Sequence, residues 1–268
     1  DDLLGILNYF RMRKEKYLII TSANVIMTTT YNDFIESHVE SGADMSVMYN
    51  RDGNEAGAPN LILDLDRRGL VKEAFSNPDK PVSVRSSLGT VCMERELFID
   101  MVSYAVSRGV AEVSIEYLIR EHKSMTVRGH EYKGVALRVN SIQDYFDATM
   151  RSLTEDVAEA LYWTDNPVYT KVKDEAPAFF GETSKVKGSM VSDGCSIEGE
   201  VNDSLLFRGV QVGEGTTLDN CIIFQNTEIG AGCHLSHVII DKDCIIRPGI
   251  SLVGQPDYPV VIGKGATV

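Results

Sequence analysis

Three segments of the sequence, VNDSLLFRGVQV (residues 201–212), LDNCIIFQNTEI (218–229) and LSHVIIDKDCII (235–246), decide the fold of this chain. They repeat every 17 residues, so that aliphatic residues fall into columns. One column holds Leu206, Ile223 and Ile240, and another holds Val212, Ile229 and Ile246. A fixed period with an apolar column and small turn residues is typical of a solenoid.

The rows also contain a shorter period. Val212 and Ile229 are each followed by a glycine, and an aliphatic residue returns six positions later, at Leu218 and Leu235. Such hexapeptide steps predict a parallel β-helix in which each coil holds three short strands. Residues 189–201 fit as an earlier row if its turn is two residues shorter. The alternative, a β-sandwich with a chance repeat, requires three rows to match in register by accident.

The composition restricts the class of protein. The 268 residues are 43% hydrophobic and 24% charged, which suffices for one large or two medium domains. The net charge of -13 disfavours nucleic acid as a partner, because phosphate binding needs a basic surface. Five cysteines without a C-x-x-C pair, no signal peptide and no long apolar run predict a reduced, cytoplasmic protein without membrane contact. The chain starts at Asp1 inside an expected helix, so we expect that an N-terminal portion is absent.

The first half of the chain alternates between expected strands and helices, which is typical of an α/β layer. Residues 17–20 are continuously apolar, as in a strand buried on both faces of a parallel sheet. They lead into Thr21-Ser-Ala-Asn24, where we expect chemistry, because ligands gather at the carboxyl ends of strands. The other expected strands are residues 45–49, 61–65, 71–75, 86–93, 125–128 and 135–139, and the expected helices are 3–16, 31–41, 94–107, 114–121 and 141–153.

Several boundaries follow from single residues. Asn32 is expected to cap the helix 31–41 and Gly42 to end it. Residues 154–183 contain Pro167 and Pro177 and are weakly periodic, so they are the expected linker. The expected domains are therefore residues 1–153, the linker 154–183, and the β-helix 184–268.

Two β-helix segments carry a family resemblance. The stretches LLFRGVQVGEG (205–215) and IIDKDCIIRPG (239–249), together with Gly42-Ala-Asp44, are similar to motifs of the bacterial ADP-glucose pyrophosphorylase family. The resemblance covers almost the whole chain. It implies part of a nucleotidyltransferase domain of the glycosyltransferase-A-like type, followed by a left-handed parallel β-helix of hexapeptide repeats that mediates subunit contacts. The implied reaction joins ATP and glucose 1-phosphate into ADP-glucose and pyrophosphate in glycogen biosynthesis, and it requires Mg²⁺ carboxylates.

The resemblance also identifies positions where this chain departs from the family. Asn24 stands at the position of the first metal-binding aspartate, and Arg138 stands at the second. An Asn carbonyl is a weak ligand for a hard cation, and an arginine there repels Mg²⁺. The sugar-phosphate clamp has Asn77 in place of a lysine, while Ser87 and Gly89 keep the family's residues. These positions are therefore expected to be a vestigial metal site and a vestigial sugar-phosphate pocket, with no catalytic residue and no bound cofactor.

This pattern resembles the non-catalytic, regulatory-type proteins of the family. It implies a partnership with the catalytic subunit of ADP-glucose pyrophosphorylase, as a homo- or hetero-oligomer, with a sugar phosphate as a candidate effector. Asn24 and Arg138 then form either a remodelled pocket for an anionic effector or relics in an unused cleft, and we favour relics.

Two other functions are open. An active nucleotidyltransferase with a rearranged metal site would need carboxylates from Asp33, Asp44 or Asp144. A hexapeptide acyltransferase would need a catalytic histidine, for which only His234 and His237 are available in the β-helix. These two histidines and the nearby Cys233 also raise the question of a metal site, but they fall on column and corner positions of the repeat, so we expect none.

Overall fold

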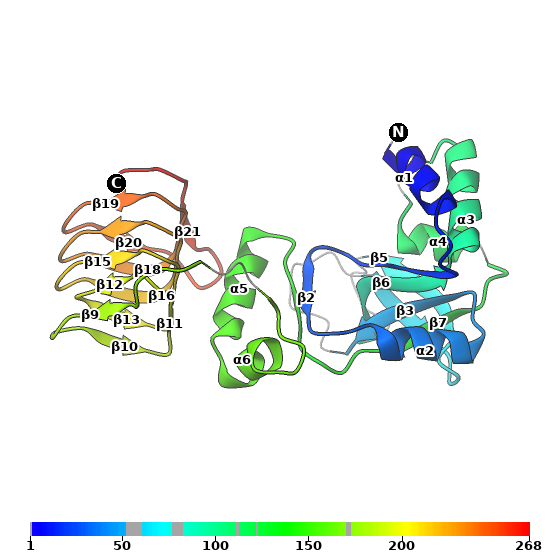
Figure 1. Ribbon diagram of the computed structural model, residues 1–268, viewed down its shortest axis with the longest axis horizontal. Helices are drawn as coiled ribbons and strands as arrows, with labels where there is room; N and C mark the ends of the chain where they lie inside the picture. Colours follow the sequence, from blue (N-terminus) through cyan, green and yellow to red (C-terminus); the bar gives the residue numbers. More distant parts are fainter. Residues whose placement is uncertain (1, 52–60, 77–82, 111–112, 122, 170–172) are drawn as a thin grey trace. The chain divides into compact units, whose positions relative to one another are not determined.

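The computed structural model describes residues 2–51, 61–76, 83–110, 113–121, 123–169 and 173–268, with side chains from residue 7 onward. The chain divides into two compact units, Asp1–Arg138 and Val139–Val268. The first unit is an α/β domain and the second is a parallel β-helix preceded by two helices (Figure 1).

The α/β unit is built on one mixed sheet. Its elements are, in chain order, α1 (Asp2–Arg11), β1 (Tyr17–Ile20), β2 (Val25–Met27), α2 (Asn32–Ser41), β3 (Met45–Asn50), β4 (Leu61–Leu65), β5 (Val71–Ser76), β6 (Ser86–Glu94), α3 (Arg95–Ser107), α4 (Ile115–Glu121), β7 (Val127–Glu131) and β8 (Ala136–Arg138). The strands run in the order β5-β4-β6-β3-β7, with β1 paired to β6. A separate two-stranded ribbon joins β2 to β8.

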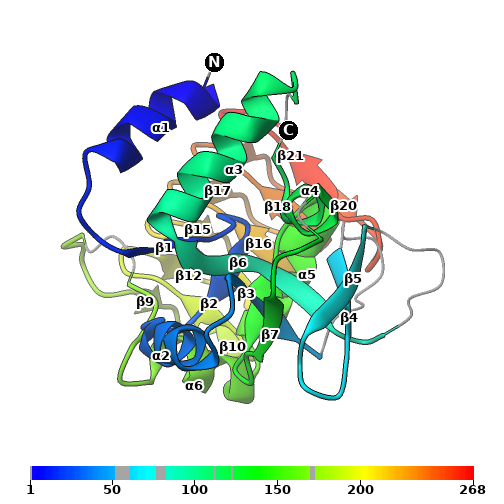
Figure 2. The same ribbon diagram turned by 90° about the vertical axis from the view of Figure 1, so that its right-hand side faces the viewer.

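Helices cover both faces of this sheet. Every residue of β3 is buried, as is expected of a central strand with apolar neighbours on both sides. On one face Met45 and Val47 pack in a cluster with Phe98 and Val102 of α3. On the other face Met48 packs with Phe34 of α2 and with Leu88 and Cys92 of β6. Figure 2 shows α1 and α3 on one side of the sheet and α2 on the other.

The predicted strands and helices of this unit are largely confirmed, but four details were wrong. The helix α1 ends at Arg11, not at residue 16. The strand β1 pairs antiparallel with β6, so its apolar run does not indicate a parallel neighbour. Tyr31, not Asn32, occupies the N-cap of α2, with a left-handed φ of 60° and no side-chain cap. The short strand β2 was not predicted, because only three residues of it pair with β8. Gly42 does end α2, with a φ of 61°.

The second unit contains the repeat. Its elements are α5 (Ile142–Ser152), α6 (Glu155–Tyr162), β9 (Phe179–Phe180), β10 (Lys185–Lys187), β11 (Met190–Val191), β12 (Ser196–Ile197), β13 (Glu200–Asn202), β14 (Leu205–Leu206), β15 (Gln211–Val212), β16 (Thr217–Ile223), β17 (Glu228–Ile229), β18 (His234–Ile240), β19 (Ile245–Ile246), β20 (Ser251–Val253) and β21 (Val260–Ile262). All strand pairs in it are parallel, which confirms the β-helix and excludes the sandwich.

The strand register reproduces the columns of the sequence. Leu206 pairs with Ile223, and Ile223 pairs with Ile240, each at the 17-residue period. The first coil is two residues shorter, since Met190 pairs with Leu205. The side chains of Leu206, Ile223 and Ile240 and those of the Val212 column point inward and are at most 3% exposed. The two columns therefore form the core of the β-helix.

One corner of the β-helix turns at Gly188 in the first coil and without glycine in the next three coils. Asp203, Asn220 and His237 stack there with φ angles of 44°, 50° and 52°. A left-handed φ is least costly for Gly, which has no side chain, and for Asn and Asp, whose short polar side chains form local hydrogen bonds. His237 shares a 2.9 Å hydrogen bond with Ser236. The prediction that His237 is a corner residue is therefore confirmed.

One flank of the β-helix is apolar outside as well as inside. Met190, Leu205, Ile222, Ile239 and Val261 form an outward column. Ile222 and Ile239 are nevertheless buried, at 0% and 6% exposed, because Phe146 of α5 packs on them. The helix α5 thus belongs to the β-helix unit, whereas the sequence placed it at the end of the first domain.

The predicted linker 154–183 contains the helix α6, which packs against α5 and buries Val157, Ala158 and Leu161. Its residues 170–172 lie outside the described part of the chain. None of the described helices is both long enough and apolar enough to cross a membrane.

Candidate functional site

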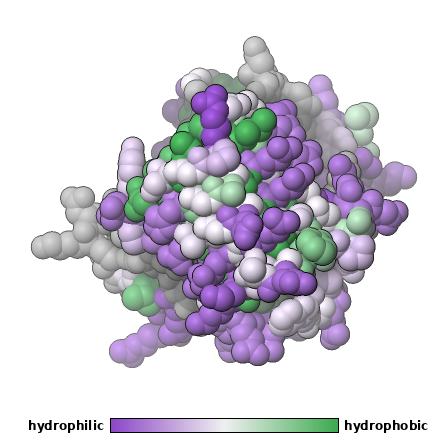
Figure 3. All heavy atoms as spheres, turned by 90° about the vertical axis from the view of Figure 1, so that its left-hand side faces the viewer, coloured by the Kyte–Doolittle hydropathy of each residue, from purple (hydrophilic) through white to green (hydrophobic). Residues whose placement is uncertain are grey.

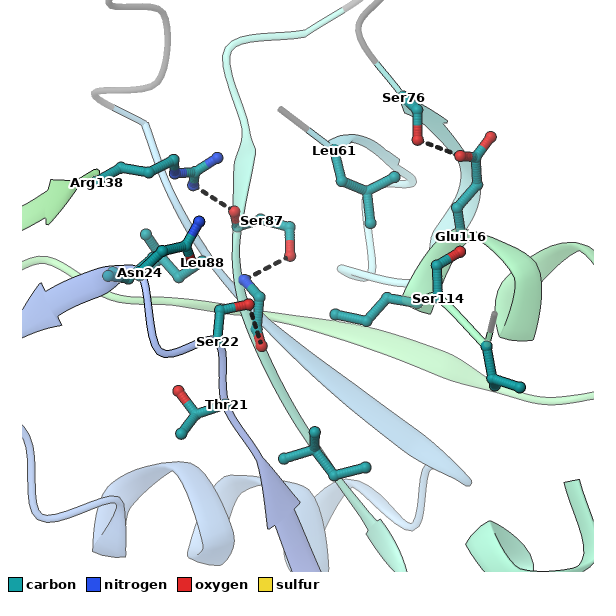
Figure 4. A pocket seen from close by; sticks show the side chains of 15 residues that line it. Thr21, Ser22, Asn24, Leu61, Ser76, Ser87, Leu88, Ser114, Glu116 and Arg138 are labelled. Atoms are coloured by element: carbon teal, nitrogen blue, oxygen red, sulfur yellow. Dashed lines mark hydrogen bonds between the residues drawn. The ribbon is translucent and has the colours of Figure 1, made fainter. Parts of the chain in front are cut away.

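A cleft of about 460 Å³ opens in the α/β unit where the chain leaves β1 (Figure 4). Its lining comes from the end of β1 and the turn after it, the first half of β6, the start of α4, the end of β5 and the last residue of β8. The described lining residues are Ile20, Thr21, Ser22, Asn24, Val25, Leu61, Ser76, Ser87, Leu88, Gly89, Val113, Ser114, Ile115, Glu116 and Arg138. Four of the five predicted site residues therefore meet in one cleft. The fifth, Asn77, lies outside the described residues.

Gly89 fixes one wall of the cleft. It has a φ of 66°, and a Cβ atom built on it would overlap Oγ of Ser22. The backbone amide of Ser22 donates to the carbonyl of Gly89 at 3.0 Å. Thr21 and Thr90 share a further hydroxyl–hydroxyl hydrogen bond of 2.9 Å beside it. The turn after β1 is thus held against β6, and glycine is needed there both for its backbone angle and for its lack of a side chain.

Arg138 enters the cleft from the end of β8. Its Nη2 donates to the backbone carbonyl of Ser87 at 2.5 Å. Because β8 pairs with β2, Val25 lies directly opposite Arg138 and Asn24 lies beside that pair. Figure 4 shows Arg138 and Asn24 on the same side of the cleft. The two positions that the family resemblance assigned to metal-binding aspartates are therefore neighbours in space.

Ser87 is buried, and its hydroxyl is used within the strand. Its Oγ accepts from the backbone amide of Gly89 at 3.1 Å. A hydroxyl that already accepts from the backbone can still donate its own proton to a ligand. Ser87 and Gly89 therefore shape the same wall of the cleft, and the Ser87 hydroxyl can still donate one hydrogen bond.

The wall opposite Arg138 contains residues that the sequence reasoning did not select. Glu116 of α4 accepts a hydrogen bond from the Ser76 hydroxyl of β5. Glu116 also pairs with Arg120 one turn later, at 3.5 Å. Ser114 caps α4 by accepting from the amide of Tyr117 at 3.1 Å. The available signal was the start of the expected helix 114–121, which carries both Ser114 and Glu116.

The charges of this cleft do not suit Mg²⁺. Glu116 is the single carboxylate among its described lining residues, and it lies across the cleft from Asn24 and Arg138 (Figure 4). A hard divalent cation prefers carboxylate and carbonyl oxygens, and a guanidinium beside it is repulsive. Among the described residues no group of three or more His, Cys, Asp and Glu side chains could hold a metal ion. The donor set at Asn24 and Arg138 therefore does not fit the family's metal.

The carboxylates of the alternative metal site lie elsewhere. Asp44 accepts from the backbone amide of Thr126 at 2.7 Å, and Asp33 lies in the first turn of α2. Neither lines the described part of the cleft. Asp144 belongs to the second unit, where it accepts from the amide of Asn140 at 2.9 Å.

The histidines of the β-helix are likewise held in structural contacts. His234 shares a 2.7 Å hydrogen bond with Thr217, the residue below it in the coil stack. His237 lies 6.0 Å from the ring of Phe146, centroid to centroid. Cys233 is buried and its Sγ lies 3.1 Å from the carbonyl of Arg247.

An α/β unit with a polar cleft beside its first strand, followed by a hexapeptide-type β-helix, defines the class of nucleotidyltransferase-like proteins with a β-helix domain. Comparison with known proteins is consistent with this class. Residues 175–257 match the family described as GlmU-like, C-terminal hexapeptide.

Full-length relatives place the chain more closely. It is 30% identical over 259 residues to the glycogen biosynthesis protein GlgD of Bacillus subtilis (strain 168), covering 97% of this chain and 66% of that protein. It is 33% identical over 260 residues to the GlgD protein of Geobacillus stearothermophilus, with the same coverage. It is 26% identical over 217 residues to the glucose-1-phosphate adenylyltransferase of Bacillus subtilis, covering 79% of this chain and 57% of that protein.

The chain thus spans about 66% of the length of these GlgD proteins. It belongs to the glucose-1-phosphate adenylyltransferase family, also called ADP-glucose pyrophosphorylases, and within it the chain is similar to the GlgD proteins of glycogen biosynthesis.

Proposed function

We propose that this protein is a regulatory subunit of glucose-1-phosphate adenylyltransferase that does not itself transfer a nucleotide. In this role it joins a catalytic subunit of the same family and changes its activity or its response to effectors. The similarity to GlgD proteins and to glucose-1-phosphate adenylyltransferases supports the partnership.

The observation that carries the proposal is the position of Arg138. Its guanidinium lies in the cleft, bonded to the carbonyl of Ser87, next to Asn24. In the family, metal carboxylates neutralise the charge that develops on the phosphates during transfer. An amide and a fixed cation at these positions supply no site for Mg²⁺. We therefore propose that the protein uses no metal cofactor, and that these residues are relics of a catalytic centre.

The direct test is an assay of ADP-glucose formation with the full-length protein alone, with a catalytic adenylyltransferase subunit alone, and with the two together. We expect no turnover above background from the protein alone at saturating Mg²⁺, and a changed maximal rate or substrate affinity in the mixture. Turnover by the protein alone contradicts the proposal and favours an active enzyme with a rearranged metal site.

Two variants distinguish relics from a used pocket. Arg138→Gln removes the cation from the cleft, and Arg67→Gln removes an exposed cation from the turn between β4 and β5 as the matched control. If the cleft is a relic, both variants leave the regulation of the partner unchanged. If Arg138→Gln alone abolishes the response to hexose phosphates, the cleft binds an anionic effector and is not a relic.

We also propose that the protein works in the cytoplasm. All five cysteines are buried and unpaired, as is usual where thiols stay reduced. Fluorescence microscopy of the tagged protein in its bacterial host tests this placement.

A further inference from the structure

The loop that follows α6 exposes three aromatic rings. This segment, residues 162–169, is called the aromatic loop below. Tyr162 is 36% exposed, Trp163 is 70% exposed and Tyr169 is 88% exposed. Trp163 is also the single tryptophan of the sequence. Removing aromatic surface from water is favourable, so rings gathered on one exposed loop indicate a surface that binds a ligand.

Both ends of the aromatic loop are held by the helix α6. The backbone amide of Val168 donates to the carbonyl of Leu161 at 2.8 Å. Leu161 is 2% exposed, so the helix end that carries this bond is anchored in the protein. Tyr162 and Tyr169 each follow one of the two bonded residues, so their Cα atoms are at most about 14 Å apart. The three rings therefore belong to one fixed platform.

Polar groups lie between the rings of the aromatic loop. Thr164, Asp165 and Asn166 are all exposed. A hydroxyl and an amide can each donate and accept hydrogen bonds, and a carboxylate accepts them. Asp165 is the single charged residue of the segment, and the segment contains no cation. Recognition of phosphate needs Lys or Arg, so this surface suits an uncharged ligand that is rich in hydroxyl groups.

A sugar ring combines the two features that this surface can recognise. The C–H groups on the face of a pyranose are attracted to the electron-rich face of an aromatic ring. The hydroxyls on its rim can exchange hydrogen bonds with a carboxylate or an amide. A specific protein partner instead needs about 800 Å² of well-packed surface on each side. A short loop whose rings are separated by polar groups therefore favours a sugar over a protein.

We propose that the aromatic loop binds a chain of α-linked glucose units. Trp163 stacks on one unit and Tyr169 on another, while Asp165 and Asn166 exchange hydrogen bonds with the hydroxyls. The choice of an α-glucan among uncharged polyols rests on the proposed function in glycogen biosynthesis. Binding would hold the subunit beside the polymer whose synthesis it serves.

The flank of the β-helix offers no similar platform among its described residues. In one outward column the exposed side chains of Phe179 and Ile245 are separated by the polar residues Ser196, Gln211 and Glu228. Figure 3 shows hydrophilic and hydrophobic residues interspersed on the side of the β-helix that it presents. Single apolar side chains in such a mixture are ordinary surface.

Two other exposed aromatic side chains of this unit differ in their setting. Phe180 is 50% exposed, but it pairs with the buried Ile197 and so ends an inward column of the β-helix. Tyr258 is 80% exposed in a turn closed by two backbone hydrogen bonds with Gln255, each 3.0 Å long. That turn, residues 255–259, carries no second aromatic residue. Tyr258 is therefore a matched control for the rings of the aromatic loop.

The first experiment titrates the full-length protein with maltoheptaose and follows tryptophan fluorescence. Because Trp163 is the single tryptophan of the sequence, a ligand stacked on it changes the emission directly. We expect a saturable change with maltoheptaose. Cellopentaose, in which the glucose units are β-linked and the chain has a different shape, should produce a much weaker change.

The second experiment measures retardation of the protein in native gels that contain glycogen. Trp163→Ala should weaken binding about tenfold, because a stacked ring is lost. Trp163→Phe should retain most of the binding, since a ring remains. Tyr258→Ala should leave binding unchanged. Circular dichroism confirms that the variants fold, and if Trp163→Ala does not, Tyr169→Ala replaces it.

Three results overturn the inference: no response to either maltoheptaose or glycogen, glycogen binding that Trp163→Ala and Tyr169→Ala both leave intact, or equal binding of cellopentaose and maltoheptaose. A Trp163→Ala variant that loses binding to a catalytic adenylyltransferase subunit, in a protein that does not bind glycogen, also overturns it and assigns the loop to that partner. Neither experiment involves nucleotide transfer. Turnover by the protein alone would therefore contradict the proposed function without affecting these results, and absent glucan binding would leave the proposed function standing.

Discussion

The two units of this protein retain different features of the family: the β-helix keeps the residues of its core, and the α/β unit keeps its sheet but not the residues of its cleft. In the β-helix, each coil contacts the next through columns such as Leu206, Ile223 and Ile240, so the positions that define the fold recur at a fixed period. In the α/β unit the sheet is intact, but the cleft beside it holds Asn24 and Arg138 where the family resemblance places carboxylates. Packing limits which residue types a core position tolerates in any folded chain. In a cleft, the residue types are limited by the chemistry only while that chemistry is used. The comparison predicts that mutations in the two units act through different physical causes.

The largest expected effect concerns the helix that completes the β-helix unit. Phe146→Ala should lower the free energy of unfolding of this unit by about 3–5 kcal/mol, because it removes the side chain that covers Ile222 and Ile239. Chemical denaturation followed by circular dichroism measures the loss. Ile142→Ala on the same helix is the control, since Ile142 is 58% exposed and should change stability by less than about 0.5 kcal/mol. Equal effects would show that α5 is not part of this core.

The second prediction tests the wall of the cleft. Gly89→Ala should destabilise the α/β unit by about 2–4 kcal/mol, from the left-handed backbone angle and from overlap with Ser22. Gly109→Ala is the control, because Gly109 has a similar φ of 72° but nothing within 4 Å of an added Cβ. Denaturation midpoints of both variants separate the two causes. A Ser22→Gly change should recover the difference between them, and no recovery would contradict the role of Ser22.

A third, smaller effect is expected inside the β-helix. The Thr216 hydroxyl is fully buried, donates to the carbonyl of Gly230 at 2.6 Å and accepts from the amide of Cys233 at 3.0 Å. Thr216→Val should therefore cost about 1–3 kcal/mol, because two buried backbone groups lose their partner. Thr183→Val, on the exposed first coil, is the control and should be nearly neutral. Thermal or chemical unfolding curves compare the two, and a neutral Thr216→Val would mean that water replaces the hydroxyl.

The smallest expected effect is a pH dependence confined to the α/β unit. His38 is 2% exposed and shares a 2.8 Å hydrogen bond with Ser46. Desolvation lowers the pKa of His38 below its ordinary value of 6.5, although the carboxylates of Glu94 and Asp44 act in the opposite direction. Burial lowers the pKa of His130 in the same way.

The sign of this effect follows from proton linkage. Below pH 6.5 the unfolded chain binds a proton at His38 that the folded chain binds only at lower pH. The free energy of unfolding is therefore unaffected by this group well above pH 6.5 and decreases as the pH falls through that value. Denaturation at a series of pH values should show a shallower decrease for His38→Gln than for Ser46→Ala. Equal slopes would exclude His38 as the cause.

The sequence predicted the β-helix and its register, including the shorter first coil, because a stacked repeat encodes each contact at a constant separation along the chain. It also identified four residues, Asn24, Ser87, Gly89 and Arg138, that meet in one cleft. The opposite wall was missed because Ser76 and Glu116 are 40 residues apart and meet only through the packing of α4 against β5. No local pattern reports a contact of that kind.

By itself, the sequence determined where the repeat lies, which side chains point into its core and which family the chain resembles. Only the tertiary structure decided that β1 runs antiparallel to β6, that α5 belongs to the β-helix unit and that the inward column ends exposed at Phe180. The physical reason is the range of the interactions. Periodicity records contacts between residues at a fixed spacing, whereas strand direction, helix docking and the covering of a core depend on which distant segments are brought together.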